Sequence, residues 1–246
     1  MADLLFSDSY LAAVYDLWHP REVRDDFDFY LPRIMQADAV LDVGCGTGMM
    51  LAEARDAGHE GRLCGLDPGA GMIALARRRA DVEWIESDLP GAGFDREFEL
   101  AVMTGHAFQA LVSDEEIDET LASLHRALVP GGCFAFETRN PAVRVWENWH
   151  PRNATEIAGP NGGPVRIETR ITAPFDGNTL GFVHDFTGED DALPLASESR
   201  LRFLDMETIA ARLFRAGFSV DEVYGDWDGS KLLPTSPEII VIAVAS

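Results

Sequence analysis

The most constraining feature of this 246-residue chain is a glycine-rich segment, VLDVGCGTG, at residues 40–48. A short apolar strand is expected to run there directly into Gly44, Gly46 and Gly48, and a helix is expected to begin near Met49. Glycines at such a turn let the backbone approach a ligand with no side chain between them. The segment therefore predicts a ligand-binding loop beyond the first strand of an open α/β sheet.

Four further apolar runs follow at strand length: RLCGLD, VEWIESD, FELAVMT and GCFAFET, with helical segments between most of them. Strands that alternate with helices predict parallel strands joined by right-handed crossovers, and hence a doubly wound sheet. The helix expected over residues 114–128 carries a capping box, Ser113 with Glu116, and a buried stripe of leucines and alanines. The fold class is therefore α/β.

The two flanks of this region have different patterns. Residues 9–35 show helical periodicity, with Pro20 and Pro32 as interruptions, and predict two or three helices. Apolar and polar residues alternate over 165–171 and again over 180–186, with a DGN turn between them, which predicts an inserted antiparallel β meander.

A last helix is expected from Met206 to Ala216, ending at Gly217, and two strands follow it. The expected division is a helical lid at 1–37, a core formed by 38–140 and 203–246, and an inserted β subdomain at 141–202.

Charge and composition exclude several classes of function. The 42 acidic and 20 basic side chains give a net charge of −22, which repels the phosphates of nucleic acid. The tight basic run Arg77–Arg79 is expected at a helix end, where cations complement the helix dipole, so nucleic acid is not an expected partner. No apolar run approaches the roughly 20 residues that cross a bilayer, so we expect a cytoplasmic protein without a membrane partner. Three scattered cysteines and six histidines without ligand spacing predict no disulfide framework and no metal.

Acidic residues follow two further strands. Asp67 lies 19 residues after Gly48, where a carboxylate can accept both hydroxyls of an adenosine ribose. Asp88 ends the third strand and can accept from the adenine amine, between apolar walls formed by Pro68, Met72 and Leu89. Each acid taken alone is equally explained as a turn or helix cap.

The rival dinucleotide fingerprint GxGxxG would need its last glycine at Met49. The loop and the two acids together therefore predict a nucleoside site of a different kind.

The segments VLDVGCGTG, GLDPGAGMI, IESDL and LVPGG before GCFAFET resemble the successive motifs of class I S-adenosylmethionine-dependent methyltransferases, over about residues 38–140. The resemblance implies S-adenosylmethionine as cofactor and a Rossmann-like seven-stranded sheet ordered 3-2-1-4-5-7-6, with only the seventh strand antiparallel. It places the methionine end at Asp42, Gly44, Cys45 and Gly46, the ribose at Asp67, and the adenine at Asp88 and Leu89.

In that strand order the segment after the fourth strand lies beside the sulfonium. Thr104 and Gly105 are predicted to contact the cofactor, and His106 is a candidate base because an unperturbed imidazole titrates near neutral pH. The alternatives are that His106 is a packing residue and that positioning alone supplies the rate. Tyr15 lies in SYLAAVYDLWHP, which resembles a lid helix, and is predicted near the methionine end or, alternatively, as a buried aromatic residue.

Three residues are predicted to contact the acceptor. Arg139 follows the fifth strand, where it anchors an acidic acceptor or forms an ion pair with a carboxylate of the chain. Trp146 and Trp227 are candidates for the roof of an acceptor pocket. The aromatic residues of the insertion are equally explained as its own core or as the face of a homodimer.

The sequence therefore predicts a methyltransferase that acts on N or O of a small molecule. The alternative is a non-catalytic S-adenosylmethionine-binding sensor or partner subunit. Binding motifs do not separate the two, and they do not identify the acceptor.

Overall fold

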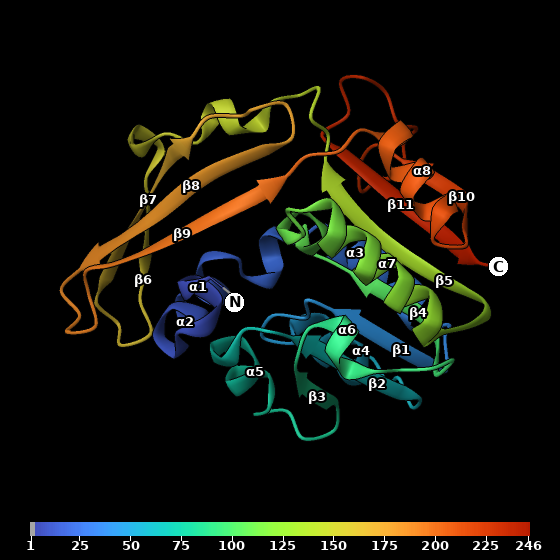
Figure 1. Cartoon of the computed structure of the whole chain (residues 1–246). Coiled ribbons are helices and arrows are strands. Elements are labelled where there is room, and N and C mark those ends of the chain that lie inside the picture. Colours follow the sequence, from blue (N-terminus) through green and yellow to red (C-terminus); the bar gives the residue numbers. More distant parts are fainter. Residues whose placement is uncertain (1–2) are drawn as a thin grey trace.

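A computed structural model describes residues 3–246 and shows a seven-stranded sheet beside a smaller four-stranded one (Figure 1). The large sheet has the order β10-β11-β5-β4-β1-β2-β3. Its strands are β1 (Ala39–Val43), β2 (Arg62–Asp67), β3 (Glu83–Glu86), β4 (Phe98–Met103), β5 (Leu128–Arg139), β10 (Phe218–Tyr224) and β11 (Glu238–Ala245). In order of the chain this is 3-2-1-4-5-7-6, and β11 is antiparallel to both of its neighbours, so the predicted topology is confirmed.

Helices cover both faces of this sheet. One face packs against α7 (Asp114–Ala127) and α8 (Met206–Arg215), with α6 (Leu89–Ala92) at its side, and the other packs against α3 (Asp26–Ile34) and α4 (Met49–Asp56). The predicted capping box of α7 is present, and Leu121 and Leu124 of its apolar stripe are fully buried. Because each helix buries one stripe and the central strands β1, β2 and β4 bury most of both faces, the alternating pattern of the sequence specifies these layers.

The prediction that Pro32 interrupts a helix is wrong, because α3 continues through it to Ile34. A proline inside a helix costs about 3 kcal/mol, since it lacks an N–H and crowds the preceding turn. Phe27, Tyr30 and Ile34 of α3 are buried, and this apolar contact with the sheet offsets the cost.

The second sheet has the order β6-β7-β8-β9 and is antiparallel throughout. It contains β6 (Thr155–Ala158), β7 (Pro164–Ala173), β8 (Thr179–Gly188) and β9 (Leu195–Arg202), and it is preceded by the short 3₁₀ helices η3 (Val145–Asn148) and η4 (Pro151–Asn153). The periodicity identified β7 and β8 but not the two edge strands.

The N-terminal helices α1 (Leu4–Ser7) and α2 (Ser9–Trp18) lie between the second sheet and α5 (Ala70–Ala76). Leu11 and Val14 of α2 pack with Val165 and Phe186 of the second sheet. On the α5 side the approach is so close that a Cβ atom at Gly71 would lie 2.6 Å from the carbonyl oxygen of Asp8. The lid segment is therefore packed on both sides, and the short helix η1 (Arg21–Val23) connects it to α3.

Candidate active site

The glycine loop between β1 and α4 has a backbone that other residues rarely adopt. Gly44, Gly46 and Gly48 have φ angles of 75°, 55° and 81°, all in the left-handed region. A side chain at Gly48 would also overlap the ring of Trp84, and a Cβ atom at Gly44 would lie 2.9 Å from that of Ala107. The three predicted loop glycines are thus required by conformation, and two of them also by close contact.

Asp67 links the ends of β1 and β2. Its Oδ2 accepts a hydrogen bond from the amide of Gly46 at 3.0 Å, and its Oδ1 accepts one from the amide of Gly69 at 2.7 Å. Burial raises the pKa of this carboxyl, and the two backbone hydrogen bonds oppose that rise. The carboxylate therefore holds the loop in place, and each oxygen keeps a second lone pair for a ligand hydroxyl.

Asp42 is fully buried, and neither of its carboxylate oxygens has a hydrogen-bond partner within residues 3–246. Burial, together with the nearby Asp67, raises its pKa to about 7. Buried polar atoms without partners are rare because they lose their hydration without compensation. A ligand with ammonium or hydroxyl donors at this loop would satisfy them, and S-adenosylmethionine carries both, so the residues present fit this cofactor.

The predicted adenine end is less distinctive. Asp88 is exposed and caps α6, where its Oδ1 accepts from the amide of Gly91 at 2.9 Å, as the helix-cap alternative anticipates. Met72 and Leu89 are buried while Pro68 is exposed. An adenine contact by these residues stays a prediction.

The thiol of Cys45 is packed inside the protein, because its sulfur lies against Gly65 of β2. The pKa of this thiol is raised well above its ordinary value by burial. We expect the backbone of Cys45, and not its side chain, to face a ligand at the loop.

His106 follows β4 and Thr104–Gly105 in a left-handed conformation, with φ of 63°. Its ring Nε2 lies 2.9 Å from Oε2 of Glu238, and its backbone amide donates to Oε1 of Glu137 at 2.6 Å. Burial, reinforced by the positive charge of Arg139, lowers the pKa of His106 well below its ordinary value. The imidazole is therefore neutral near pH 7. Glu238 contacts its ring and Glu137 its backbone amide, and Ala107 in the next position lies against the glycine loop.

Glu137 is fully buried on β5 and also accepts a hydrogen bond from the hydroxyl of Tyr30 at 2.6 Å. Burial raises its pKa to about 8, against the effect of the donors Tyr30 and His106. Glu137 therefore carries a proton near pH 7 in the folded chain but not in the unfolded one.

We expect Glu137→Gln to change how stability depends on pH. Between the unfolded pKa of about 4.3 and the folded pKa of about 8, the folded state binds the extra proton, so wild-type stability falls as pH rises. Glutamine does not titrate, so the stability of the variant relative to wild type should increase by up to about 1.4 kcal/mol per pH unit.

Denaturant unfolding between pH 5 and 8, followed by tryptophan fluorescence, measures this difference. Glu60→Gln is the matched control, since Glu60 is exposed and forms no recorded hydrogen bond or ion pair in the described chain. Parallel pH dependences for wild type and Glu137→Gln would contradict a protonated Glu137.

The lid reaches the loop through polar contacts. Thr47 donates to Oδ1 of Asp16 on α2 at 2.6 Å. Arg24, after η1, forms a two-point ion pair with Asp26 and lies 3.2 Å from the Cβ position of Gly105. The ring of Tyr15 lies 4.5 Å from that of His19 at a tilt of 36°, and burial raises the pKa of Tyr15 despite the charges of Arg24 and Arg139. Tyr15 is therefore among the residues gathered at the carboxyl end of the sheet.

The three predicted acceptor residues separate in the structure. Arg139 joins the site, because it is the register partner of Glu238 across β5 and β11. Trp146 is only 4% exposed and packs on Phe175 and Phe203, as the insertion's own core. Trp227 packs on Phe29 and Tyr30 of α3, and Tyr30 contacts Glu137 of the site. An acceptor contact by either tryptophan stays a prediction.

Sequence reasoning missed Glu137, Glu238 and Arg24. An acid inside the apolar run GCFAFET is a usable signal, because glutamate is almost never fully buried unless it is paired. Glu238 is likewise an acidic residue in an apolar strand, since it is the first residue of the final strand. Arg24 has no local pattern that distinguishes it from other lid residues.

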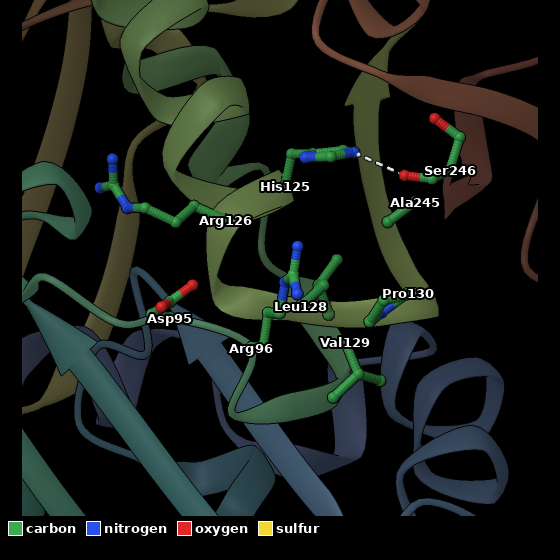
Figure 2. A pocket seen from close by; sticks show the side chains of 9 residues that line it. All are labelled: Asp95, Arg96, His125, Arg126, Leu128, Val129, Pro130, Ala245 and Ser246. Atoms are coloured by element: carbon green, nitrogen blue, oxygen red, sulfur yellow. Dashed lines mark hydrogen bonds between the residues drawn. The ribbon is translucent and has the colours of Figure 1, made fainter.

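A separate hollow of about 230 Å³ lies at the opposite end of the strands, where β5 begins and β11 ends (Figure 2). His125, Arg96 and Arg126 project around it, and His125 contacts the carbonyl oxygen of Ser246 at 3.2 Å. Since the glycine loop follows the carboxyl end of β1, this hollow is not part of the site.

Within residues 3–246, no three histidine, cysteine, aspartate or glutamate side chains are grouped so that they could hold a metal ion. None of the helices in the same range has the length and apolar character that crossing a membrane requires.

Comparison with known proteins agrees with this geometry. Residues 40–132 match a family described as a methyltransferase domain. The cypemycin N-terminal methyltransferase of a Streptomyces species is 26% identical over 213 residues, which cover 85% of this chain and 84% of that protein. The 2-phytyl-1,4-naphtoquinone methyltransferase of Thermosynechococcus vestitus is 31% identical over 124 residues, 47% of this chain, and the match spans only about half (54%) of the relative's length.

Among solved structures, the CcbJ methyltransferase from Streptomyces caelestis superposes with a TM-score of 0.77 at 17% identity and covers 98% of both chains. This likeness shows the fold, including the inserted sheet. Together with the strand order, it shows the Rossmann-like methyltransferase fold, and the methyltransferase domain family matches residues 40–132 of this chain.

Proposed function

We propose that this chain transfers a methyl group from S-adenosylmethionine to N or O of a small-molecule acceptor. The observation that carries the proposal is the convergence at one sheet edge of a left-handed glycine loop, the loop-binding carboxylate of Asp67 and the unpartnered carboxylate of Asp42. These groups match the donors and the close approach that this cofactor needs. The relatives reported above are named as methyltransferases, which favours catalysis over a non-catalytic sensor.

In this proposal the loop glycines and Asp42 hold the methionine end, Asp67 the ribose, and the region of Met72, Asp88 and Leu89 the adenine. When bound, S-adenosylmethionine supplies an electrophilic methyl carbon on a sulfonium sulfur, whose C–S bond breaks as the acceptor's lone pair forms the new bond and the bonding electrons stay on sulfur. Helices α1 to α3 of the lid segment exclude water from this region, and the inserted segment 141–202 covers the acceptor side.

His106 is proposed as the group that accepts the proton of the acceptor. When Glu238 is ionised, it accepts a hydrogen bond from Nε2–H of His106, so the other ring nitrogen keeps a free lone pair. Burial raises the pKa of Glu238 to about 7, against the effect of Arg139. Glu238 thus acts as a positioning residue that selects the imidazole tautomer.

The test is a screen of amine and hydroxyl acceptors that follows S-adenosylhomocysteine release. We expect at least one acceptor to give release that depends on enzyme and acceptor together. Tight cofactor binding without turnover on any acceptor would instead favour the sensor.

A further inference from the structure

Arg139 differs from the other partly buried arginines of the site because no carboxylate lies within ion-pair distance of it in residues 3–246. Its Nη1 donates to Oε1 of Gln109 at 2.9 Å, and no other side-chain acceptor for the guanidinium is recorded in that range. Arg24, in contrast, is paired with Asp26 at 2.6 Å. Burial lowers the pKa of Arg139, while the carboxylates of Glu238 and Glu137 oppose that effect from beyond ion-pair distance. A desolvated cation without a direct ion-pair partner is unfavourable, so this guanidinium is suited to bind a carboxylate that is not part of the chain.

Gln109 fixes how Arg139 is presented. It is fully buried, and its Nε2 donates to the carbonyl oxygen of Arg202 at 3.0 Å, so its Oε1 is the atom that faces the guanidinium. This contact occupies one N–H at Nη1. The Nε–Nη2 edge remains, and that edge can bind a carboxylate with two parallel hydrogen bonds.

Arg139 lies close to the proposed reaction centre. It is the register partner of Glu238, which in turn contacts His106. Its charge also acts on the pKa values of His106 and Tyr15. A group bound to Arg139 would therefore belong to the acceptor and not to the adenosine part of the cofactor.

A chain of ring contacts leads from Arg139 to the lid. The guanidinium carbon lies 5.7 Å from the ring of Trp149. Successive ring centroids then lie 4.5–5.1 Å apart through Trp149, Phe182, His184, Trp18, His19 and Tyr15. Burial lowers the pKa of both histidines to about 4, so this wall is uncharged near pH 7.

We propose that Arg139 binds a carboxylate of the methyl acceptor, and that the apolar or aromatic body of the acceptor lies along this ring wall. The inference rests on the proposed methyltransferase function and names its substrate class: amino or hydroxy compounds that carry one carboxylate. A single unpaired cation matches a single negative charge. A diphosphate would need further cations, but Arg24 is already paired and the net charge of −22 opposes a polyanion.

The test compares carboxylates with their neutral amides. Benzoate, phenylacetate, 4-aminobenzoate and L-phenylalanine, each beside its carboxamide, are titrated calorimetrically into the protein saturated with S-adenosylhomocysteine. We expect at least one carboxylate to bind wild type roughly 10- to 100-fold more tightly than its amide. Arg139→Met should abolish this preference, and Arg139→Lys should retain part of it.

Arg152→Met is the matched control, because Arg152 is exposed and forms no recorded ion pair in the described chain. The absence of any carboxylate preference in wild type overturns the proposal, as does a preference that survives in Arg139→Met. Tighter binding of phenyl phosphate than of every carboxylate also overturns it. S-adenosylhomocysteine is titrated first into wild type and every variant. If it fails to bind wild type, the result counts against the proposed function. If it binds normally but no carboxylate preference is found, the result counts against the Arg139 site alone.

Discussion

Asp67→Ala is expected to weaken S-adenosylmethionine binding by about 2 to 4 kcal/mol, or roughly 30- to 1,000-fold in Kd. Two losses add in this variant. The proposed ribose hydroxyls lose a charged acceptor, and the amides of Gly46 and Gly69 lose theirs, so the glycine loop is no longer held in its left-handed conformation. Isothermal titration calorimetry with S-adenosylmethionine measures the change.

Two further variants make this result specific. Asp67→Asn keeps one acceptor oxygen but presents an NH₂ group to the second backbone donor. We expect its loss of affinity for S-adenosylmethionine to be smaller than that of Asp67→Ala. Asp95→Ala removes an exposed acid at the hollow on the opposite end of the strands and should bind the cofactor normally. Unchanged affinity in Asp67→Ala would remove Asp67 from the cofactor site.

His106→Ala is expected to lower kcat by about 10²- to 10⁴-fold, the usual contribution of a positioned general base. Its Kd for S-adenosylhomocysteine should stay within about twofold of wild type, because the proposed role lies in proton transfer. His106 has a positive φ, so alanine also introduces backbone strain. Asn tolerates this conformation, and His106→Asn therefore separates loss of the imidazole from strain. Equal turnover by His106→Asn and wild type would exclude a base at this position.

Glu238→Gln tests the positioning role within the same experiment. Below pH 7 the protonated Glu238 donates to Nε2, which places the imidazole proton on the nitrogen needed for catalysis. Wild-type kcat should therefore rise with pH through about 7, as Glu238 ionises. The variant should lack this step, while KM for S-adenosylmethionine changes little. A pH profile parallel to that of wild type would leave Glu238 with a structural role only.

Local sequence patterns are enough to predict some elements of this fold. The glycine loop, the capping box of α7 and the alternation of β7 and β8 depend on backbone preferences and burial periodicity within a few residues. The edge strand β6 buries no residue fully, and the buried positions of the edge strand β9 are Ser197 and Ser199, so neither strand shows an apolar periodicity that could be detected. Pro32 shows the converse, because contacts of α3 with the sheet outweigh a local penalty.

The candidate site was only partly predictable for a related reason. Trp146 and Trp227 have the residue type expected of an acceptor pocket, but residues distant in sequence bury Trp146 in one packing cluster and hold the partly buried Trp227 against another. Asp88 has the position expected of an adenine ligand, and the structure shows it as a helix cap. Residue type and strand-end position do not distinguish a ligand-binding side chain from a structural one.

The sequence by itself determined the alternation of strands and helices, the glycine loop and the presence of Asp42 and Asp67 at neighbouring strand ends, because parallel strands joined by crossovers bring their carboxyl ends to one edge. The order of the strands followed from the resemblance to the methyltransferase motifs. Only the tertiary structure decided that His106 meets Glu238, which lies 132 positions away in the chain, that burial raises the pKa of Glu137, and that no carboxylate of residues 3–246 lies within ion-pair distance of Arg139. Proton affinity and charge pairing depend on distance through space and on exclusion of water, and neither is encoded in the local order of residues.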